Sequence, residues 1–415
     1  MDSSTGRNFS PSLVAPAGNL EKLKHAVRFG AHEVYFGGES FNLRSQSGNF
    51  SPEDIEEGIG FCARHGVKTV FLLNSFVHEN DVPAVKSYLR EIASYTFDAV
   101  MVSDPGMLML LKESGSKIPV HLSTQMSTLN HPAVRFWHSL GVSRVVLARE
   151  ATLDEIKIIR DHTDAALEVF VHGALCVSYS GRCLLSRFLS GRDANQGNCS
   201  HPCRWRYALV EEKREGAHME FIEHARGAEI LSSRDLCLIG RLKEYAAAGV
   251  DAFKIEGRMK SLYYAANTVR IYRHALDVIA AGDDPGPHLP FWNAELDLVS
   301  HRPYTDDLFN EFGGEGFSPT PYIRKTLFMG YGCDGESGEE IRVKVFNPIY
   351  EGDGLEAIYP IQGNRVLDSA CVVEAVMEEN EEKNVAMARP GKIYRIKFDR
   401  AVFPDAVFRR KIQKP

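Results

Sequence analysis

Short apolar runs alternate with amphipathic stretches along the first two-thirds of the chain. The apolar runs are rich in β-branched residues and predict strands at 12–15, 33–36, 69–73, 99–102, 120–122, 144–147, 168–171 and 252–255. Between them, helical spacing predicts helices at 20–29, 52–65, 82–94, 105–114, 133–140, 153–161 and 236–248, with another at 262–281. Apolar strands separated by helices indicate a parallel sheet that is covered on its outside. We therefore predict an α/β protein built on a (β/α)8 TIM-type barrel, with a doubly wound open sheet as the alternative.

The repeat is interrupted once and then gives way to a different pattern. An insertion at 173–250 separates the seventh predicted strand from the eighth, and it contains a predicted hairpin at 207–212, 221–223 and 229–232. Turn-forming residues after the barrel predict a linker at 283–318. Short alternating strands then predict a small antiparallel β-barrel, at 322–329, 340–346, 354–358, 371–377 and 392–399. The predicted domains are a TIM-type barrel at 1–282 and a C-terminal β-barrel at 319–415.

The barrel prediction has a functional consequence, because ligand sites of such barrels lie at the C-terminal ends of the strands. Nearly every predicted strand has an ionisable or amide side chain near that end, namely Asn19, Asn74, Asp104, His121, Gln125, Arg149, Glu150, His172, Glu256 and Arg258. Loops are commonly polar, so one such residue would mean little. The whole set, at one end of one barrel, indicates a ligand site.

Cysteines are concentrated in residues 167–206, a segment otherwise rich in Gly, Ser and Asn. It holds four of the chain's eight cysteines, Cys176, Cys183, Cys199 and Cys203, and Cys237 follows. A segment of this composition buries little apolar surface, so we expect a metal to stabilise it. The spacing C-x6-C-x15-C-x3-C-x33-C matches neither a zinc ribbon nor a ferredoxin run. Four thiolates could hold a [4Fe–4S] cluster or a tetrahedral zinc ion, and the spacing leaves open which of the five is spare.

Single cysteines carry further expectations. Cys237 is predicted at the start of a helix, where the helix dipole would favour its thiolate. Cys176 follows His172 closely, which allows a Cys–His nucleophile pair for hydrolysis. A metal-bound thiolate is not available as a nucleophile, so the two hypotheses compete for Cys176. The remaining three cysteines lie in apolar patterns typical of a core, at Cys62, Cys333 and Cys371.

Charge gives the chain no general attraction for nucleic acid, because it has 48 Lys and Arg residues against 55 Asp and Glu, a net charge of −7. RNA binding would require a local basic surface. One candidate is the insertion, with Arg182, Arg187, Arg192, Arg204 and Arg206 beside Trp205 and Tyr207. The other is the C-terminal end, with Lys392, Arg395, Lys397, Arg400, Arg409, Arg410, Lys411 and Lys414.

The same composition bears on location. No apolar run is long enough to span a membrane, and the N-terminus lacks the apolar core of a signal peptide. Clustered cysteines in such a chain favour metal binding in the reducing cytoplasm over disulfides. We therefore expect a cytoplasmic protein with no membrane partner.

Four stretches together resemble the peptidase U32 family: VAPAGN, FVHGALCVSYSGRC, NQGNCSHPCRW and DAFKIEGRMKS. The similarity is dense over 12–275 and extends into the C-terminal β-domain. NQGNCSHPCRW, followed by RYALVEEKR and SSRDLCLI, is most similar to the tRNA-hydroxylating members. The resemblance implies an oxygen-independent hydroxylase with a [4Fe–4S] cluster, and the cluster ligands of the quinone-pathway members fall on Cys176, Cys183, Cys199 and Cys237. Cys203 then becomes the spare thiol.

The resemblance also implies a reaction. The tRNA-hydroxylating members form 5-hydroxyuridine at the wobble position with prephenate as the hydroxyl source, so tRNA and prephenate are the expected partners. For the carboxylates of prephenate we expect Arg149 and Arg258, and for proton transfer His121 and His172, beside Glu150 and Glu256. The alternatives are a collagenase-like peptidase, a hydroxylase of another RNA base or of a quinone precursor, and an RNA-binding protein without enzymatic activity.

Overall fold

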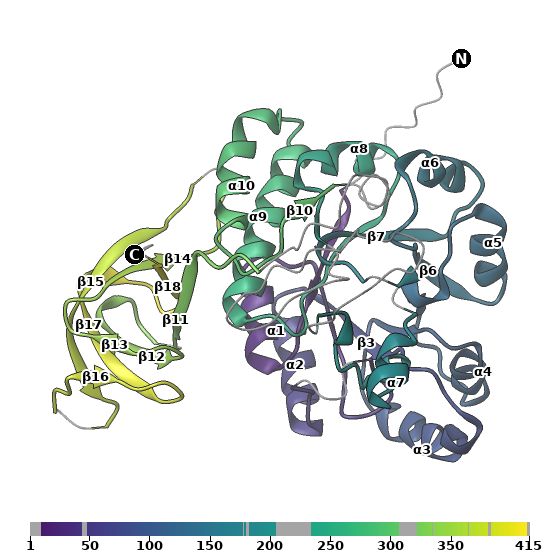
Figure 1. The fold of residues 1–415 in the computed structure, drawn as a ribbon, viewed down its shortest axis with the longest axis horizontal. Coiled ribbons are helices and arrows are strands. Elements are labelled where there is room, and N and C mark those ends of the chain that lie inside the picture. Colours follow the sequence, from purple (N-terminus) through teal and green to yellow (C-terminus); the bar gives the residue numbers. More distant parts are fainter. Residues whose placement is uncertain are drawn as a thin grey trace, which may run out of the picture.

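The computed structural model describes residues 10–43, 48–176, 178–179, 182–204, 234–306, 322–333, 335–363, 365–380 and 383–412. Eight parallel strands form a closed barrel in the larger of two domains (Figure 1). They are β1 (Ser12–Pro16), β2 (Glu33–Phe36), β3 (Lys68–Leu73), β4 (Ala99–Val102), β5 (Val120–Leu122), β6 (Val142–Val146), β7 (Ala166–Ala174) and β9 (Ala252–Ile255). β9 pairs with β1 on one side and β7 on the other, which closes the sheet. The predicted TIM-type barrel is confirmed, and the open sheet is excluded.

Helices surround this barrel (Figure 1), namely α1 (Leu20–Arg28), α2 (Pro52–Arg64), α3 (Val82–Ile92), α4 (Pro105–Glu113), α5 (His131–Ser139), α6 (Leu153–Asp161), α8 (Leu242–Ala247) and α9 (Leu262–Ala280). Several begin at a side chain that accepts a backbone N–H of the first turn. Asn19 caps α1 in this way and Asp104 caps α4. These two candidate ligand residues therefore have a structural role. None of the helices in the described ranges is long and apolar enough to cross a membrane.

The segment predicted as a helix at 236–248 differs from the prediction. Strand β8 (Asp235–Cys237) pairs antiparallel with the end of β7, and α8 begins only at Leu242. The end of β7 extends past its pairing with β9, so its backbone groups need partners there, and β8 supplies them. The prediction that Cys237 begins a helix is therefore wrong.

The stretch predicted as a linker, 283–318, contains regular structure. Helix α10 (Leu289–Leu296) packs against α9, and Trp292 is fully buried there. Its indole Nε1 donates to His274 Nδ1 at 3.0 Å. Strand β10 (Tyr304–Thr305) then pairs with β8. Residues 307–321 lie outside the described residues, as does the predicted hairpin at 207–212, 221–223 and 229–232.

The C-terminal domain is a second closed barrel with antiparallel strands, as predicted (Figure 1). Its strands are β11 (Thr326–Gly332), β12 (Gly338–Val345), β14 (Gly354–Ile358), β15 (Ser369–Glu378), β17 (Ile393–Val402) and β18 (Val407–Lys411), while β13 (Ile349–Tyr350) and β16 (Met387–Ala388) form a separate pair. β18 was not predicted. It closes the barrel by pairing with both β11 and β14.

Buried ion pairs join the two domains. Glu295 on α10 accepts from Arg270 on α9 at 2.6 Å and from Arg409 on β18 at 2.6 and 2.9 Å. Arg270 also lies 2.6 Å from Asp368, and Arg409 lies 2.8 Å from Glu356. Removing a shared carboxylate would leave buried cations under-compensated, which costs more than the pair itself contributes.

We predict that Glu295→Ala lowers the free energy of unfolding by about 3–5 kcal/mol, because two buried guanidinium groups lose a common acceptor. The control is Glu374→Ala, which removes an exposed carboxylate 2.9 Å from Lys397 and should cost less than about 1 kcal/mol. Urea unfolding of both variants measures the difference. Equal losses would contradict the assignment of Glu295 as the carboxylate that ties the domains together.

Candidate active site

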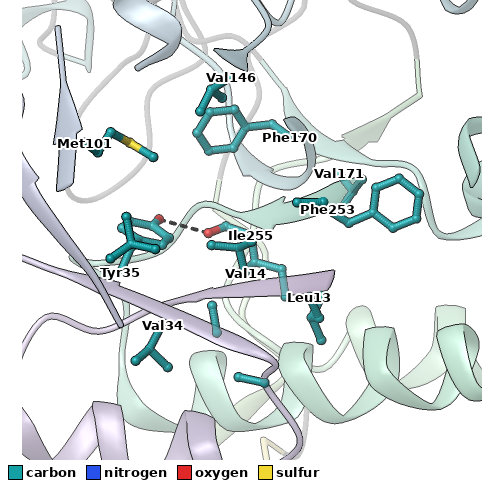
Figure 2. Close-up of a cluster of buried hydrophobic side chains, with 14 of the residues drawn as sticks. Leu13, Val14, Val34, Tyr35, Met101, Val146, Phe170, Val171, Phe253 and Ile255 are labelled. Atoms are coloured by element: carbon teal, nitrogen blue, oxygen red, sulfur yellow. Dashed lines mark hydrogen bonds between the residues drawn. The ribbon is translucent and has the colours of Figure 1, made fainter. Parts of the chain in front are cut away.

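A cavity of about 170 Å³ lies at the C-terminal end of the large barrel. Strand ends and the loops after them surround it, as expected for a TIM-type barrel. Its wall combines apolar or aromatic side chains (Tyr35, Leu72, Met101, Val146, Phe170), amides (Asn74, Gln125), charged groups (Arg149, Lys254, Glu256, Arg258, Arg302) and thiols (Cys176, Cys183, Cys199, Cys203). Figure 2 shows Tyr35, Met101, Val146 and Phe170 around one part of the barrel interior.

Positive charge predominates in this wall, where four cations accompany one carboxylate. The nearly buried Arg258 donates from Nη1 to Asn42 Oδ1 and from Nη2 to Asn49 Oδ1, both at 3.1 Å. Arg149 stacks on Phe170, with its Cζ 4.1 Å from the ring centroid, and lies 4.0 Å from the Glu256 carboxylate. The structure thus brings Arg149, Glu256 and Arg258 together in one cavity wall. A wall of this charge favours an anionic ligand.

Two glycines allow the loop after β9 to reach the cavity. A Cβ on Gly18 would lie 2.2 Å from the carbonyl oxygen of Arg258. Gly173 has φ +109°, and a Cβ there would lie 2.5 Å from the carbonyl oxygen of Glu256. At Gly173 only glycine tolerates both the positive φ and the close backbone approach, and at Gly18 the close approach alone excludes a side chain. The glycines of VAPAGN and FVHGALC therefore position the two charged residues that follow β9.

The two predicted proton-transfer histidines lie outside the cavity wall. Burial, with Arg144 close by, lowers the pKa of His121 to about 3, and its Nδ1 has no hydrogen-bond partner in the described part of the chain. Burial also lowers the pKa of His172 to about 3, and its Nδ1 lies 3.2 Å from the Tyr272 hydroxyl. Both histidines are therefore neutral near pH 7 and enclosed by protein.

Glu150 lies in a neighbouring cavity of about 240 Å³, whose wall also includes Arg149, Arg241 and Asp306. Arg149 and Phe170 line both cavities, so they form the partition between them. Arg149 and Glu150 both line this second cavity, but only Arg149 also lines the main one. Glu150 therefore does not join Glu256 at the main cavity.

Four thiols share the main cavity. Cys176, Cys183 and Cys199 line it as the predicted ligand set requires, and Cys203 lines it as well. Cys237 is not among the lining residues. Burial raises the pKa of the Cys237 thiol, whose Sγ lies 3.8 Å from the Tyr272 hydroxyl. Among the described residues, no three His, Cys, Asp or Glu side chains form a ready metal site.

The Cys–His pair required for a peptidase is not assembled in the described residues. His172 contacts tyrosine rings and the Tyr272 hydroxyl, and no hydrogen bond joins it to Cys176 there. Cys176 instead faces the cavity among the other thiols. Among the described residues, Cys176 therefore belongs to a shared thiol surface and not to a Cys–His pair.

Sequence reasoning missed several cavity residues. Lys254 is the charged residue in the otherwise apolar strand AFKI, and a charge in such a strand could have indicated a functional side chain. Arg302 follows a segment without helical or strand periodicity, so nothing in the sequence indicated that it reaches the cavity. Its Nε donates to Asp235 Oδ1 at 2.9 Å. Asn42 and Asn49 were also missed, because their role depends on the position of Arg258.

The predicted basic surface of the C-terminal domain is largely neutralised by carboxylates. Six of its cations lie within 4.0 Å of an Asp or Glu oxygen, namely Arg395, Lys397, Arg400, Arg409, Arg410 and Lys411. Lys414 lies outside the described residues. In the insertion, Arg187 pairs with Asp193 at 3.1 Å, whereas Arg182 donates to the carbonyl of Gln125. Arg206, Trp205 and Tyr207 lie outside the described residues, and the side chain of Arg204 is likewise not described.

Comparison with known proteins identifies the family. The model of Peptidase family U32 matches residues 18–315. The chain belongs to peptidase family U32. The tRNA hydroxylation protein P1 of Bacillus subtilis (strain 168) is 34% identical to it over 96% of this chain and 94% of that protein. The 23S rRNA 5-hydroxycytidine C2501 synthase of Escherichia coli (strain K12) is 34% identical over 83% of this chain and 52% of that protein. A collagenase of Porphyromonas gingivalis (strain ATCC BAA-308 / W83) is 32% identical over 72% of this chain and 73% of that protein.

The buried His121 predicts how the stability of this U32 protein depends on pH. Its folded-state pKa of about 3 lies below the ordinary value of 6.5, so the unfolded chain binds the proton first. Stability should therefore be complete above about pH 6.5 and decrease as the pH falls toward 3, by up to about 1.4 kcal/mol per pH unit for this group. His121→Gln should show a shallower decrease in urea unfolding. The same change at the exposed His78 should leave the slope as in the wild type, and identical slopes for all three proteins would refute the prediction.

Proposed function

We propose that this protein hydroxylates an RNA base, with the wobble uridine of tRNA as target and 5-hydroxyuridine as product. Prephenate is the proposed hydroxyl donor, and a [4Fe–4S] cluster is the proposed cofactor. The observation that carries the proposal is the cavity wall, where four thiols and four cations share one end of the barrel. The names of two relatives, a tRNA hydroxylation protein and an rRNA 5-hydroxycytidine synthase, support RNA as the substrate class.

The positively charged wall suits a small anion such as prephenate, which carries two carboxylates. Arg258 is oriented by Asn42 and Asn49, so it can donate charge-assisted hydrogen bonds without first losing much side-chain freedom. Glu256 accepts from the Tyr35 hydroxyl at 3.4 Å and is the carboxylate of the wall. We assign proton transfer to Glu256 and Tyr35, because His121 and His172 lie outside the wall.

The donor set of the cavity fits an iron–sulfur cluster, since cysteine thiolates are its usual protein ligands. We propose Cys176, Cys183, Cys199 and Cys237 as ligands, with Cys203 as the alternative to Cys237. When bound, the cluster would supply one-electron transfer. The backbone N–H of His201 lies 3.4 Å from Cys199 Sγ, a contact of the type that tunes a thiolate ligand.

The insertion is the proposed RNA-facing surface. Its helix α7 (Leu185–Ser190) displays Phe188 with 86% of its surface exposed, and Arg187 lies beside it. Arg182, at the same end of the barrel, lies 5.7 Å from the Phe76 ring. Exposed aromatic rings and arginines are the side chains on which single-stranded bases stack. The paired cations of the C-terminal domain are less suited to phosphate, because carboxylates already compensate them.

The proposed reaction predicts the effect of Arg258→Ala. Truncating this nearly buried donor should lower hydroxylation at least about 30-fold, because loss of a buried charged partner costs about 2–5 kcal/mol. Cells that lack the gene are complemented with the wild type or a variant, and wobble nucleosides are measured by mass spectrometry. The control is Arg273→Ala on α9, which removes an arginine paired with Asp277 outside the cavity. Unchanged 5-hydroxyuridine-derived nucleosides in cells lacking the gene would overturn the proposed function.

The proposed cofactor predicts iron and sulfide in the anaerobically purified full chain. Serine in place of Cys176, Cys183, Cys199 or Cys237 should remove most of both, because a cluster with three thiolates is held less firmly. Cys203→Ser should retain them, as should Cys371→Ser in the core of the small barrel. If Cys237→Ser keeps its iron and sulfide while Cys203→Ser loses them, the fourth cluster ligand is Cys203 and not Cys237. Zinc in place of iron would contradict the cluster.

The second candidate is a peptidase, which the name of the Porphyromonas gingivalis relative favours. Such an enzyme would release peptides from gelatin, and its activity would survive the removal of iron. It would also depend on Cys176 as a nucleophile while remaining insensitive to Cys183→Ser. Hydroxylation that depends on all of the cluster thiols would exclude it.

A further inference from the structure

Lys254 is a buried cation in the cavity wall to which the proposed function assigns no individual role. Lys254 lies within β9 and lines the cavity, and only 3% of its surface is exposed. Its Nζ lies 4.4 Å from the centroid of the Tyr35 ring and 5.5 Å from that of Phe170. The ammonium group therefore lies at the cavity wall between the rings of Tyr35 and Phe170.

The hydrogen bonds of Lys254 leave room for a ligand. An ammonium group has three N–H donors. One is directed to Glu168 Oε1 at 2.9 Å, and another lies 3.4 Å from Met101 Sδ, which is a weak acceptor. Only one strong acceptor in the described residues therefore serves this buried cation. A ligand oxygen in the cavity would supply the second.

A charge network behind Lys254 holds it in place. Glu168 also accepts from Arg144 at 3.2 Å, and Arg144 binds Glu33 at 2.7 and 2.9 Å. None of these three lines the cavity, and each lies two positions before a residue of its own strand that does, so they form the layer beneath the cavity wall. Burial alone would raise the pKa of Glu168, but Lys254 and Arg144 lower it to about 2. Glu168 is therefore a permanent anion that fixes the position of the lysine.

Two cations of the cavity wall lie close to one aromatic ring. Lys254 lies within β9, whereas Arg149 and Arg258 follow the ends of β6 and β9, and all three line the cavity. The centroid of the Phe170 ring lies 5.5 Å from Lys254 Nζ and 4.1 Å from Arg149 Cζ. Arg258 is four positions after Lys254, which limits their Cα separation to about 14 Å. One small molecule with two neighbouring carboxylates can therefore reach Lys254 and an arginine.

We propose that Lys254 binds one carboxylate of a small cyclic dicarboxylate, while Arg258 and Arg149 bind the other. The inference rests on the proposed function, because prephenate has a ring with one carboxylate attached directly and another on a 2-oxo acid arm. The ring carboxylate is assigned to Lys254, since it has the short reach that a cation between two aromatic walls requires. The longer arm, which leaves the same ring carbon, extends to Arg149 and Arg258.

The test compares two ligands on the anaerobically purified full chain by calorimetry. Prephenate carries both carboxylates, whereas phenylpyruvate keeps the ring and the 2-oxo acid arm but lacks the ring carboxylate. Lys254→Met should weaken prephenate binding at least 10-fold and change phenylpyruvate binding less than 2-fold. Lys254→Arg should restore part of the difference. Lys68→Met, at the N-terminal end of β3, is the matched control and should leave both affinities unchanged.

Lys254→Met also leaves the Glu168 carboxylate without its lysine partner. The double variant Lys254→Met/Glu168→Gln is therefore measured beside it, because it removes both charges of this pair. The same selective loss of prephenate in both supports the proposal. An equal loss for both ligands would mean that Lys254 only maintains the structure, and no loss would mean that it does not meet the ligand. Wild-type protein that binds neither compound would overturn both this inference and the proposed donor. The expected selective loss of prephenate binding, together with unchanged wobble nucleosides in cells lacking the gene, would overturn the RNA reaction alone.

Discussion

The site depends on one closure, the pairing of β9 between β7 and β1. The long insertion separates β9 from β7 in the chain, yet hydrogen bonding places Phe170 beside Lys254 and sets the loop that carries Glu256 and Arg258 over the barrel. β9 and the loop after it thus supply Lys254, Glu256 and Arg258 to the cavity wall. Without this closure the thiols that follow β7 and the cations that follow β9 would not share a wall.

Two buried charge networks accompany this closure. One lies inside the large barrel, where Glu33, Arg144, Glu168 and Lys254 come from four different strands. The other joins the domains through Glu295, with Arg270 on one side and Arg409 on the other. Buried ion pairs contribute little net stability compared with apolar packing, but a wrong arrangement leaves a charge uncompensated. We infer that these networks select one arrangement of strands and one orientation of the small barrel.

The insertion gives the cysteines two different environments. Cys176, Cys183, Cys199 and Cys203 face the cavity, whereas Cys237 belongs to a strand that extends the sheet beside Tyr272. A cluster that used Cys237 would therefore connect the cavity wall to the added strands, and one that used Cys203 would remain within the loop. In the described residues no hydrogen bond joins Cys176 to a base, and its neighbours in the cavity wall are other thiols.

The sequence by itself determined the eight barrel strands, most of the helices around them, the change to an antiparallel domain and the segment that carries the thiols. These features depend on periodicity and composition, which are local properties of the chain. Only the tertiary structure decided that Cys237 ends a strand, that His121 and His172 are enclosed, that Lys254 and Arg302 reach the cavity, and that the C-terminal cations are paired. Each of these outcomes depends on a partner far away in the chain, such as β7 for Cys237, Asp235 for Arg302 or Glu295 for Arg409. Burial and pairing of this kind have no period in the sequence, because they arise only when distant strands meet.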